Sequence, residues 1–90
     1  SAAHDETVLW NPSREITEAI TANVVVELDG RRVTPPVECG LLPGTMRAEL
    51  LASGEIVEAR VTVDELLLAQ RFWLINSVRG WREAVLDTQR

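Results

Sequence analysis

A tight hairpin signal in the first third of the chain constrains the fold more than any other feature of the sequence. Asn23 to Leu28 holds three consecutive valines, and β-branched residues favour a buried strand. Asp29-Gly30 follows directly, and both residues accept the positive φ angles of a two-residue hairpin turn. Arg31 to Thr34 is expected to be the returning strand, which Pro35-Pro36 ends because proline cannot donate to the ladder. These residues predict a sheet whose strands sit mainly in hairpins.

Shorter runs of β-forming residues lie on both sides of this hairpin. Alternation of polar and apolar residues indicates a half-buried strand, and a short continuous apolar run indicates a buried one. Turns are expected where Asn11-Pro12-Ser13 and Asn76 to Gly80 interrupt the runs. The further strands predicted are Thr7 to Trp10, Glu15 to Ala19, Ile56 to Val61, Phe72 to Ile75 and Trp81 to Leu86.

A first helix is expected from Thr45 to Ala52, after a loop from Val37 to Gly44 that holds two glycines and a proline. Its apolar residues fall on one side, as the helical period requires. Ser53-Gly54 ends it, because glycine commonly follows the last residue of a helix. The apolar side comprises Met46, Leu50 and Leu51.

A second helix is expected to begin at the sequence Thr62-Val63-Asp64-Glu65. This Thr-x-x-Glu pattern is a capping box, in which two side chains satisfy free backbone N–H groups at a helix start. The helix should continue to about Arg71. With these seven short runs and two short helices, the predicted class is α+β, with a mixed, mainly antiparallel sheet curled toward a partial barrel.

Length, charge and cysteine content restrict the kind of protein. Ninety residues allow a single domain, 1–90, with a modest core. A net charge of −5 argues against a nucleic-acid surface, and no apolar run approaches the ~20 residues of a membrane span. Cys39 has no second cysteine to pair with, which favours a reducing compartment and a cytoplasmic location. His4 has no partner residues, and no cluster has metal-ligand spacing.

The chain contains no lysine, and its nine basic residues are all arginines. A Schiff base between a protein and a carbonyl compound needs a lysine amine. A general bias toward arginine explains most of the skew, but the chemical consequence is the same. Any Schiff-base chemistry would have to be completed by residues outside this sequence.

The loop from Leu41 to Arg47 is the most informative local feature. Gly44 lets the backbone approach a ligand closely, and the helix that follows points free N–H groups and its positive dipole end outward. This geometry suits an anion such as a phosphate ester. By itself such a junction is more often purely structural, because every helix start can hold an anion.

The order of four short motifs carries a family resemblance. They are Glu18-Ala-Ile-Thr-Ala-Asn23, Val33-Thr-Pro-Pro36, Gly40-Leu-Leu-Pro-Gly-Thr-Met-Arg47 and Asn76-Ser-Val-Arg-Gly80. In this order they resemble the C-terminal domain of fold-type IV pyridoxal-phosphate aminotransferases and lyases, over about residues 6 to 87. The last motif, continued by Trp81, resembles aminodeoxychorismate lyase, in particular the form fused behind a para-aminobenzoate synthase component. Branched-chain and D-amino-acid aminotransferases usually carry a Ser/Thr-Gly-Thr-like turn there instead.

The resemblance implies cofactor-binding roles for particular residues. Glu18 would face the pyridine nitrogen of pyridoxal phosphate, and Asn23 would support that geometry. Backbone N–H groups of Thr45 and Met46 would hold the phosphate, and Ser77 would give it a hydroxyl. Weaker candidates, near the phosphate or a substrate carboxylate, are Asn76 and Arg79.

The resemblance also implies that the chain is part of a larger enzyme. In the family the cofactor-bearing lysine lies upstream of the Glu18 segment, so the chain would hold no catalytic residue and be inactive alone. The whole enzyme would eliminate pyruvate from aminodeoxychorismate, giving 4-aminobenzoate for folate biosynthesis. Its expected partners are the missing N-terminal domain, this small-molecule substrate and a second copy in a homodimer.

Two alternatives remain open from the sequence. One is the C-terminal domain of a branched-chain or D-amino-acid aminotransferase, which shares the fold. The other is a non-catalytic β-rich binding module, which the absence of lysine fits equally well.

Overall fold

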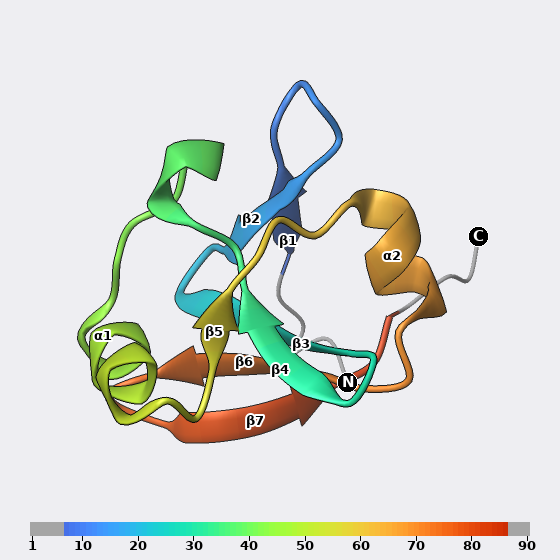
Figure 1. Cartoon of the computed structure of the whole chain (residues 1–90). Coiled ribbons are helices and arrows are strands. Elements are labelled where there is room, and N and C mark those ends of the chain that lie inside the picture. The colour runs from blue at the N-terminus through green and yellow to red at the C-terminus, as the bar shows by residue number, and fades with distance from the viewer. Residues whose placement is uncertain (1–6, 87–90) are drawn as a thin grey trace.

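The computed structural model describes residues 7–86, which form one sheet and two α-helices (Figure 1). The polar N-terminal segment with His4 and the tail 87–90 lie outside the described residues. Seven strands are present in this part of the chain, one at each of the seven runs named from the sequence. They are β1 (Val8–Trp10), β2 (Ile16–Ala19), β3 (Ala22–Leu28), β4 (Arg31–Thr34), β5 (Val57–Glu58), β6 (Phe72–Asn76) and β7 (Gly80–Ala84). The helices are α1 (Thr45–Ser53) and α2 (Val63–Leu68), and a 3₁₀ turn, η2 (Val37–Cys39), precedes α1.

Strand β3 is the centre of the sheet, because it pairs antiparallel with β2, β4 and β6. Strand β6 continues the sheet to β7, while β4 and β5 form a parallel pair. An isolated bridge between Glu15 and Thr62 brings the start of β2 against the residues before α2. The sheet therefore curls without closing, and the expected α+β class with a mainly antiparallel sheet is confirmed.

The predicted hairpin forms the β3–β4 connection. Asp29 and Gly30 have φ angles of 52° and 77°, the left-handed values that a tight turn requires. Val26 then faces Val33 across the two strands, and both are fully buried. The three valines of β3 are buried as expected because both faces of this strand are covered.

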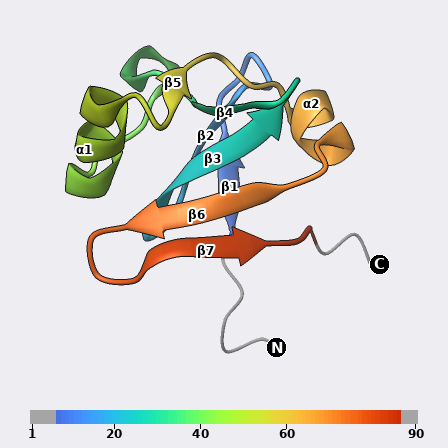
Figure 2. The same ribbon diagram turned by 60° about the horizontal axis from the view of Figure 1, so that its bottom comes forward.

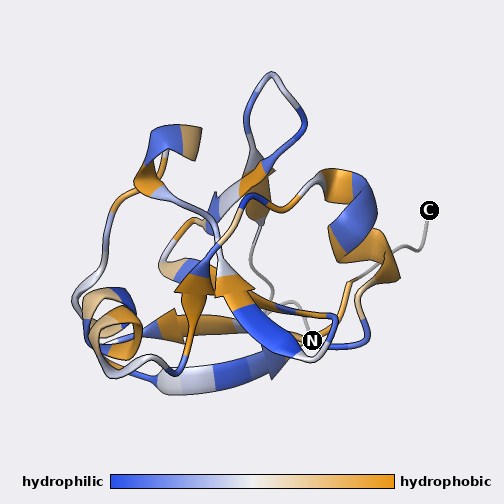
Figure 3. Ribbon diagram, in the orientation of Figure 1, coloured by the Kyte–Doolittle hydropathy of each residue, from blue (hydrophilic) through white to orange (hydrophobic). Residues whose placement is uncertain are grey.

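Two apolar clusters lie on opposite faces of the sheet, since successive residues of a strand point to opposite sides. Val24, Val26 and Leu74 belong to one cluster, which is closed by Leu66 of α2. Val25 and its neighbours on β6 belong to the other cluster, which α1 covers. Strand β6 is largely apolar, whereas its neighbour β7 is mostly hydrophilic (Figure 3). The cluster under α1 comprises Val25, Leu50, Ile56, Trp73 and Ile75, with Met46, Leu51 and Trp81 at its margin.

Helix α2 lies near the start of β6 and α1 near its end (Figure 2). The expected capping box is present, because the Thr62 hydroxyl accepts from the Glu65 N–H and the Glu65 carboxylate accepts from the Thr62 N–H. The helix stops at Leu68, earlier than the expected Arg71, since Ala69 is already extended with ψ of 142°. Leu67 and Leu68 are exposed, and α2 is anchored by the buried Leu66 and the partly buried Val63.

Three expected elements differ from the structure. The predicted loop Val37 to Gly44 contains the 3₁₀ turn η2, which buries Cys39. The predicted strand Ile56 to Val61 pairs only at Val57 and Glu58, both exposed, because the chain leaves β4 to reach the Glu15–Thr62 bridge. Buried and exposed residues do not alternate along β2, because Thr17 is buried as well as Ile16. The Thr17 hydroxyl can be buried because it donates to the Leu9 carbonyl.

Candidate functional site

Glu18 and Asn23 are brought together by the β2–β3 hairpin. The two residues face each other directly in the register of these antiparallel strands, so their side chains emerge on one face. Asn23 also faces Ile75 of β6 and is 6% exposed, whereas Glu18 is half-buried. The β2–β3 hairpin therefore places the Glu18 and Asn23 side chains next to each other.

Both side chains hold the loop that leads into α1. The Asn23 amide donates from Nδ2 to the Leu42 carbonyl at 2.9 Å, and its Oδ1 accepts from the Gly44 N–H at 3.1 Å. The Glu18 carboxylate accepts from the Leu42 N–H at 3.0 Å. The sequence between the buried Leu41 and Gly44 is therefore fixed by the two residues that the motif order placed at the site.

The start of α1 carries no side-chain cap. Gly44 is the N-cap residue, with φ of −69° and ψ of 162°, and no side chain there can accept a hydrogen bond. The first turn holds no acidic residue, and the first intrahelical bond runs from the Ala48 N–H to the Gly44 carbonyl. By helix geometry the N–H groups of Thr45 and Met46 have no acceptor within the helix. Such groups can donate to an anion, and that Thr45 and Met46 hold one stays a prediction.

Arg47 anchors the same helix to the sheet and was not singled out from the sequence as a structural residue. Its side chain is 4% exposed and donates to the Pro35 carbonyl at 3.1 Å and to the Glu58 carboxylate at 2.5 Å. A signal was present, because residue 47 lies three and four positions before Leu50 and Leu51 and so shares their buried side.

The turn between β6 and β7 lies at the same end of the sheet. Asn76 donates to the Thr21 carbonyl at 3.1 Å and accepts from the backbone N–H groups of Val78 and Arg79. Its amide therefore shapes the turn, and a role as cofactor ligand stays a prediction. Ser77 follows in this turn and is exposed. That Ser77 shares one anion with the start of α1 also stays a prediction.

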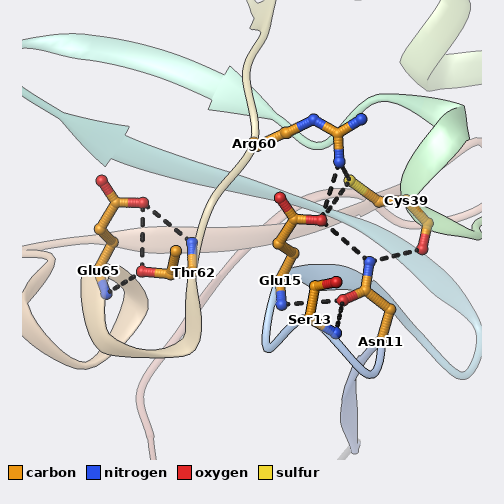
Figure 4. A network of polar contacts seen from close by, with 7 residues as sticks. All are labelled: Asn11, Ser13, Glu15, Cys39, Arg60, Thr62 and Glu65. Carbon is orange, nitrogen blue, oxygen red and sulfur yellow. Dashed lines mark hydrogen bonds and ion pairs between the residues drawn. The ribbon is translucent and has the colours of Figure 1, made fainter.

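A second polar network lies at the other end of β2 and was not anticipated from the sequence (Figure 4). The Asn11 amide donates to the Glu15 carboxylate at 3.2 Å, and Arg60 pairs with the same carboxylate at 2.9 Å. The hydrogen bond from Asn11 and the charge of Arg60 lower the pKa of Glu15. Burial, with the nearby Glu15 charge, raises the pKa of the Cys39 thiol, so this cysteine is held as a neutral thiol.

A hollow of about 860 Å³ opens between β1, α2 and the end of β7, away from the Glu18 pair. Its lining is mainly apolar and includes Val8, Leu66, Phe72 and Leu86. It exposes part of the cluster under α2. Its lining also includes the charged residues Arg79, Arg82 and Glu83, but neither Glu18 nor the start of α1. Arg79, a candidate for the phosphate or a substrate carboxylate, therefore faces this hollow. The candidate site is the loop and helix start.

The chemistry of this site fits a cofactor with a phosphate ester and a basic ring nitrogen. Uncapped N–H groups at the start of α1 suit the phosphate, and the half-buried Glu18 carboxylate suits a protonated nitrogen. Within residues 7–86, no group of three or more His, Cys, Asp or Glu side chains could hold a metal ion. No helix in this described stretch is long and apolar enough to cross a membrane.

Comparison with known proteins gives matches to a family model and to a curated protein. The model of the class IV amino-transferase family matches residues 1–85. A Schizosaccharomyces pombe protein provisionally named aminodeoxychorismate lyase is 36% identical over 87 residues, covering 93% of this chain and 38% of that protein. The chain belongs to the class IV amino-transferase family, and its resemblance to fold-type IV enzymes is confirmed.

Solved structures include both kinds of enzyme that the motifs resemble. A Mesorhizobium loti protein, provisionally named amino-acid aminotransferase, superposes with a TM-score of 0.87 at 43% identity, over 92% of this chain and 41% of that one. The 4-amino-4-deoxychorismate lyase of Pseudomonas aeruginosa superposes with a TM-score of 0.80 at 31% identity, over 93% of this chain and 33% of that one. The chain thus spans about two fifths or less of the length of these relatives.

Proposed function

We propose that this chain is the C-terminal, cofactor-binding part of a pyridoxal-phosphate-dependent aminodeoxychorismate lyase. The complete enzyme would release pyruvate from aminodeoxychorismate and leave 4-aminobenzoate, in folate biosynthesis in the cytoplasm. The observation that carries the proposal is the single unit formed by Glu18, the Leu42–Gly44 loop and the uncapped start of α1. Relatives named as lyases of this substrate supply the choice of reaction.

Each part of this unit has a chemical task in the proposed reaction. Bound pyridoxal phosphate supplies an electron sink when the substrate Cα loses its proton. The Glu18 carboxylate would hold a proton on the ring nitrogen, which strengthens that sink. The N–H groups of Thr45 and Met46, with the Ser77 hydroxyl, would bind the phosphate and so fix the ring above the sheet end.

The chain lacks lysine, so the group that attaches the cofactor would come from the rest of a longer protein. We also expect the complete enzyme to form a homodimer. Treating the 90-residue chain with pyridoxal phosphate and borohydride should therefore trap an adduct at the α-amine alone. A stoichiometric adduct elsewhere in the chain would contradict this division of labour.

The proposal is tested in a longer protein that contains this chain. Incubation with aminodeoxychorismate should give 4-aminobenzoate and pyruvate in equal amounts. Glu18→Ala should lower kcat by about 100-fold or more, because the ring nitrogen loses its proton-holding partner. Glu55→Ala removes an exposed carboxylate in the loop after α1 and serves as the matched control. Equal losses in both variants would remove the role assigned to Glu18.

A second candidate is an aminotransferase, which the 43% identity to the Mesorhizobium loti protein favours. The same unit would serve it, because proton loss from Cα is common to both reactions. Alanine or glutamate offered as amino donor separates the two. Transfer of their amino group to a keto acid, with no release of 4-aminobenzoate, would establish the aminotransferase.

A further inference from the structure

We propose that Asn23 is a positioning residue, whose amide fixes the spacing between the Glu18 carboxylate and the start of α1. This inference rests on the proposed function, since these two groups are the ones proposed to hold the ring nitrogen and the phosphate. Asn23 is 6% exposed, and both polar ends of its amide bond to protein backbone. It acts on the ligand through the loop and not by contact.

The Leu42 peptide is held from both strands of the hairpin. Its carbonyl accepts from Asn23 of β3, and its N–H donates to Glu18 of β2. Since Glu18 and Asn23 face each other in register, their side chains bond to the same loop residue from two paired strands. Movement of Leu42 would therefore have to break hydrogen bonds to both strands.

The same amide reaches the helix start itself. Asn23 Oδ1 accepts from the Gly44 N–H at 3.1 Å, and Gly44 is the N-cap residue of α1. One amide orientation satisfies both bonds, because Leu42 presents an acceptor and Gly44 a donor. Asn23 thus ties the residue bonded to Glu18 to the residue that begins the phosphate-binding turn.

Gly44 is matched to this arrangement. A Cβ atom on residue 44 would lie 2.6 Å from Asn23 Oδ1, a distance that real Cβ atoms do not show. The φ angle of Gly44 is −69°, which any residue adopts, so the backbone itself does not require glycine. The close approach of the Asn23 amide is therefore what requires glycine at this position.

Helix α1 has independent anchors, so loss of Asn23 should shift its start without unfolding it. Arg47 holds the helix to Pro35 and Glu58, and Leu50 packs in the cluster under α1. These contacts involve neither Asn23 nor the Leu42–Gly44 loop. A change in ligand binding in an Asn23 variant can therefore be separated from a loss of fold.

The test uses the 90-residue chain and inorganic phosphate, followed through the NMR amide signals of Thr45 and Met46. Asn23→Ala should weaken phosphate binding by about tenfold, because small displacements of binding groups carry costs of this order. Thr62→Ala is the matched control, since it removes a stabilising hydrogen bond at the start of α2. The control should leave phosphate affinity unchanged although it also lowers stability.

Gly44→Ala gives a second variant, which retains the Asn23 side chain. It should weaken phosphate binding to a similar degree by displacing the amide, and the double variant with Asn23→Ala should bind no more weakly than Asn23→Ala alone. Full affinity in Asn23→Ala, or additive losses in the double variant, would overturn the positioning role and leave the proposed function standing. Absence of phosphate binding at Thr45 and Met46 in the unaltered chain would overturn both.

Discussion

The two helices of this domain begin in opposite ways. Helix α2 starts at Thr62 with a complete capping box and has Asp64 and Glu65 in its first turn (Figure 4). Helix α1 starts at Gly44 with no side-chain cap and no acidic residue in its first turn. At α2, the side chains of Thr62 and Glu65 bond to backbone N–H groups of the helix start. At α1, Asn23 of β3 accepts from the Gly44 N–H, and no side chain of the first turn caps the helix. The difference separates a start built for stability from one that can accept an anion.

The contrast between the two helix starts supports an anion site at α1 better than the helix start alone does. Any helix N-terminus attracts anions, so the feature has little weight alone. At α1 the sheet supplies a carboxylate and an amide that fix the approach to the helix, and neither is needed to cap it. At α2 the acidic residues already occupy the positive end of the helix. We therefore expect the two starts to respond differently to substitution and to phosphate.

The largest effect is expected from Gly44→Ala. The new methyl group would meet Asn23 Oδ1 at 2.6 Å, and overpacking of this kind costs about 2 kcal/mol of the free energy of unfolding. Thr62→Ser, at the corresponding position of α2, keeps the capping hydroxyl and should be nearly neutral. Denaturant unfolding of both variants measures the difference. If Gly44→Ala left the free energy of unfolding unchanged, the Asn23 side-chain amide would be free to move aside.

Removal of the capping box should have a smaller effect. Thr62→Ala leaves the Glu65 N–H without its acceptor and should lower the free energy of unfolding by about 1 kcal/mol. Phosphate affinity should not change, because α2 lies at the opposite end of β6 from α1. Unfolding curves and a phosphate titration of the same sample check both statements. A parallel fall in affinity would show that the two starts are not independent.

An acidic residue at the start of α1 should make it resemble α2. Thr45→Asp places a carboxylate in the first turn, where it should raise the free energy of unfolding by about 0.5 kcal/mol through the helix dipole. The same carboxylate should occupy the free N–H groups and abolish phosphate binding. Thr45→Asn, which is similar in size and uncharged, is the control. Retained phosphate binding in the aspartate variant would place the anion elsewhere.

The smallest effect concerns Glu15, whose carboxylate belongs to the network with Asn11 and Arg60. Its pKa is lowered by the hydrogen bond from Asn11 and by Arg60, so the folded protein binds this proton less readily than the unfolded one. The stabilisation is complete above the ordinary glutamate pKa of 4.5 and is lost as the pH falls through the lower folded value. Glu15→Gln should reduce the loss in the free energy of unfolding as the pH falls through this acid range. An unchanged loss in this range would argue against the network.

Much of the fold could be predicted because local patterns determine it. Asp29-Gly30 predicted the hairpin through its backbone preferences, and the Thr62–Glu65 spacing predicted the capping box. Strand Ile56 to Val61 was overestimated, because its alternation does not reveal that β4 offers a partner for only two residues. Pairing between distant segments depends on the whole sheet, which short patterns do not encode.

The sequence named the candidate residues, but it did not predict the hydrogen bonds that join them. The motif order pointed to Glu18, Asn23 and the start of α1, and the structure joins them through Leu42 and Gly44. That the Asn23 amide bonds to backbone depends on the loop folding back over β3, which the sequence spacing alone does not specify. The turn with Ser77 lies beside the β2–β3 turn, and its contact with an anion stays a prediction.

The most direct test of the account is a phosphate titration of the unaltered chain, read at individual backbone amides by NMR. We expect the Thr45 and Met46 signals to shift and to saturate together, accompanied by Ser77, while Val63 and Asp64 at the start of α2 stay fixed. The saturation should be reached at high phosphate concentration, because the dipole of an exposed helix start contributes only about 0.3–1 kcal/mol. Equal shifts at both helix starts, or no shift at Thr45 and Met46, would contradict the account.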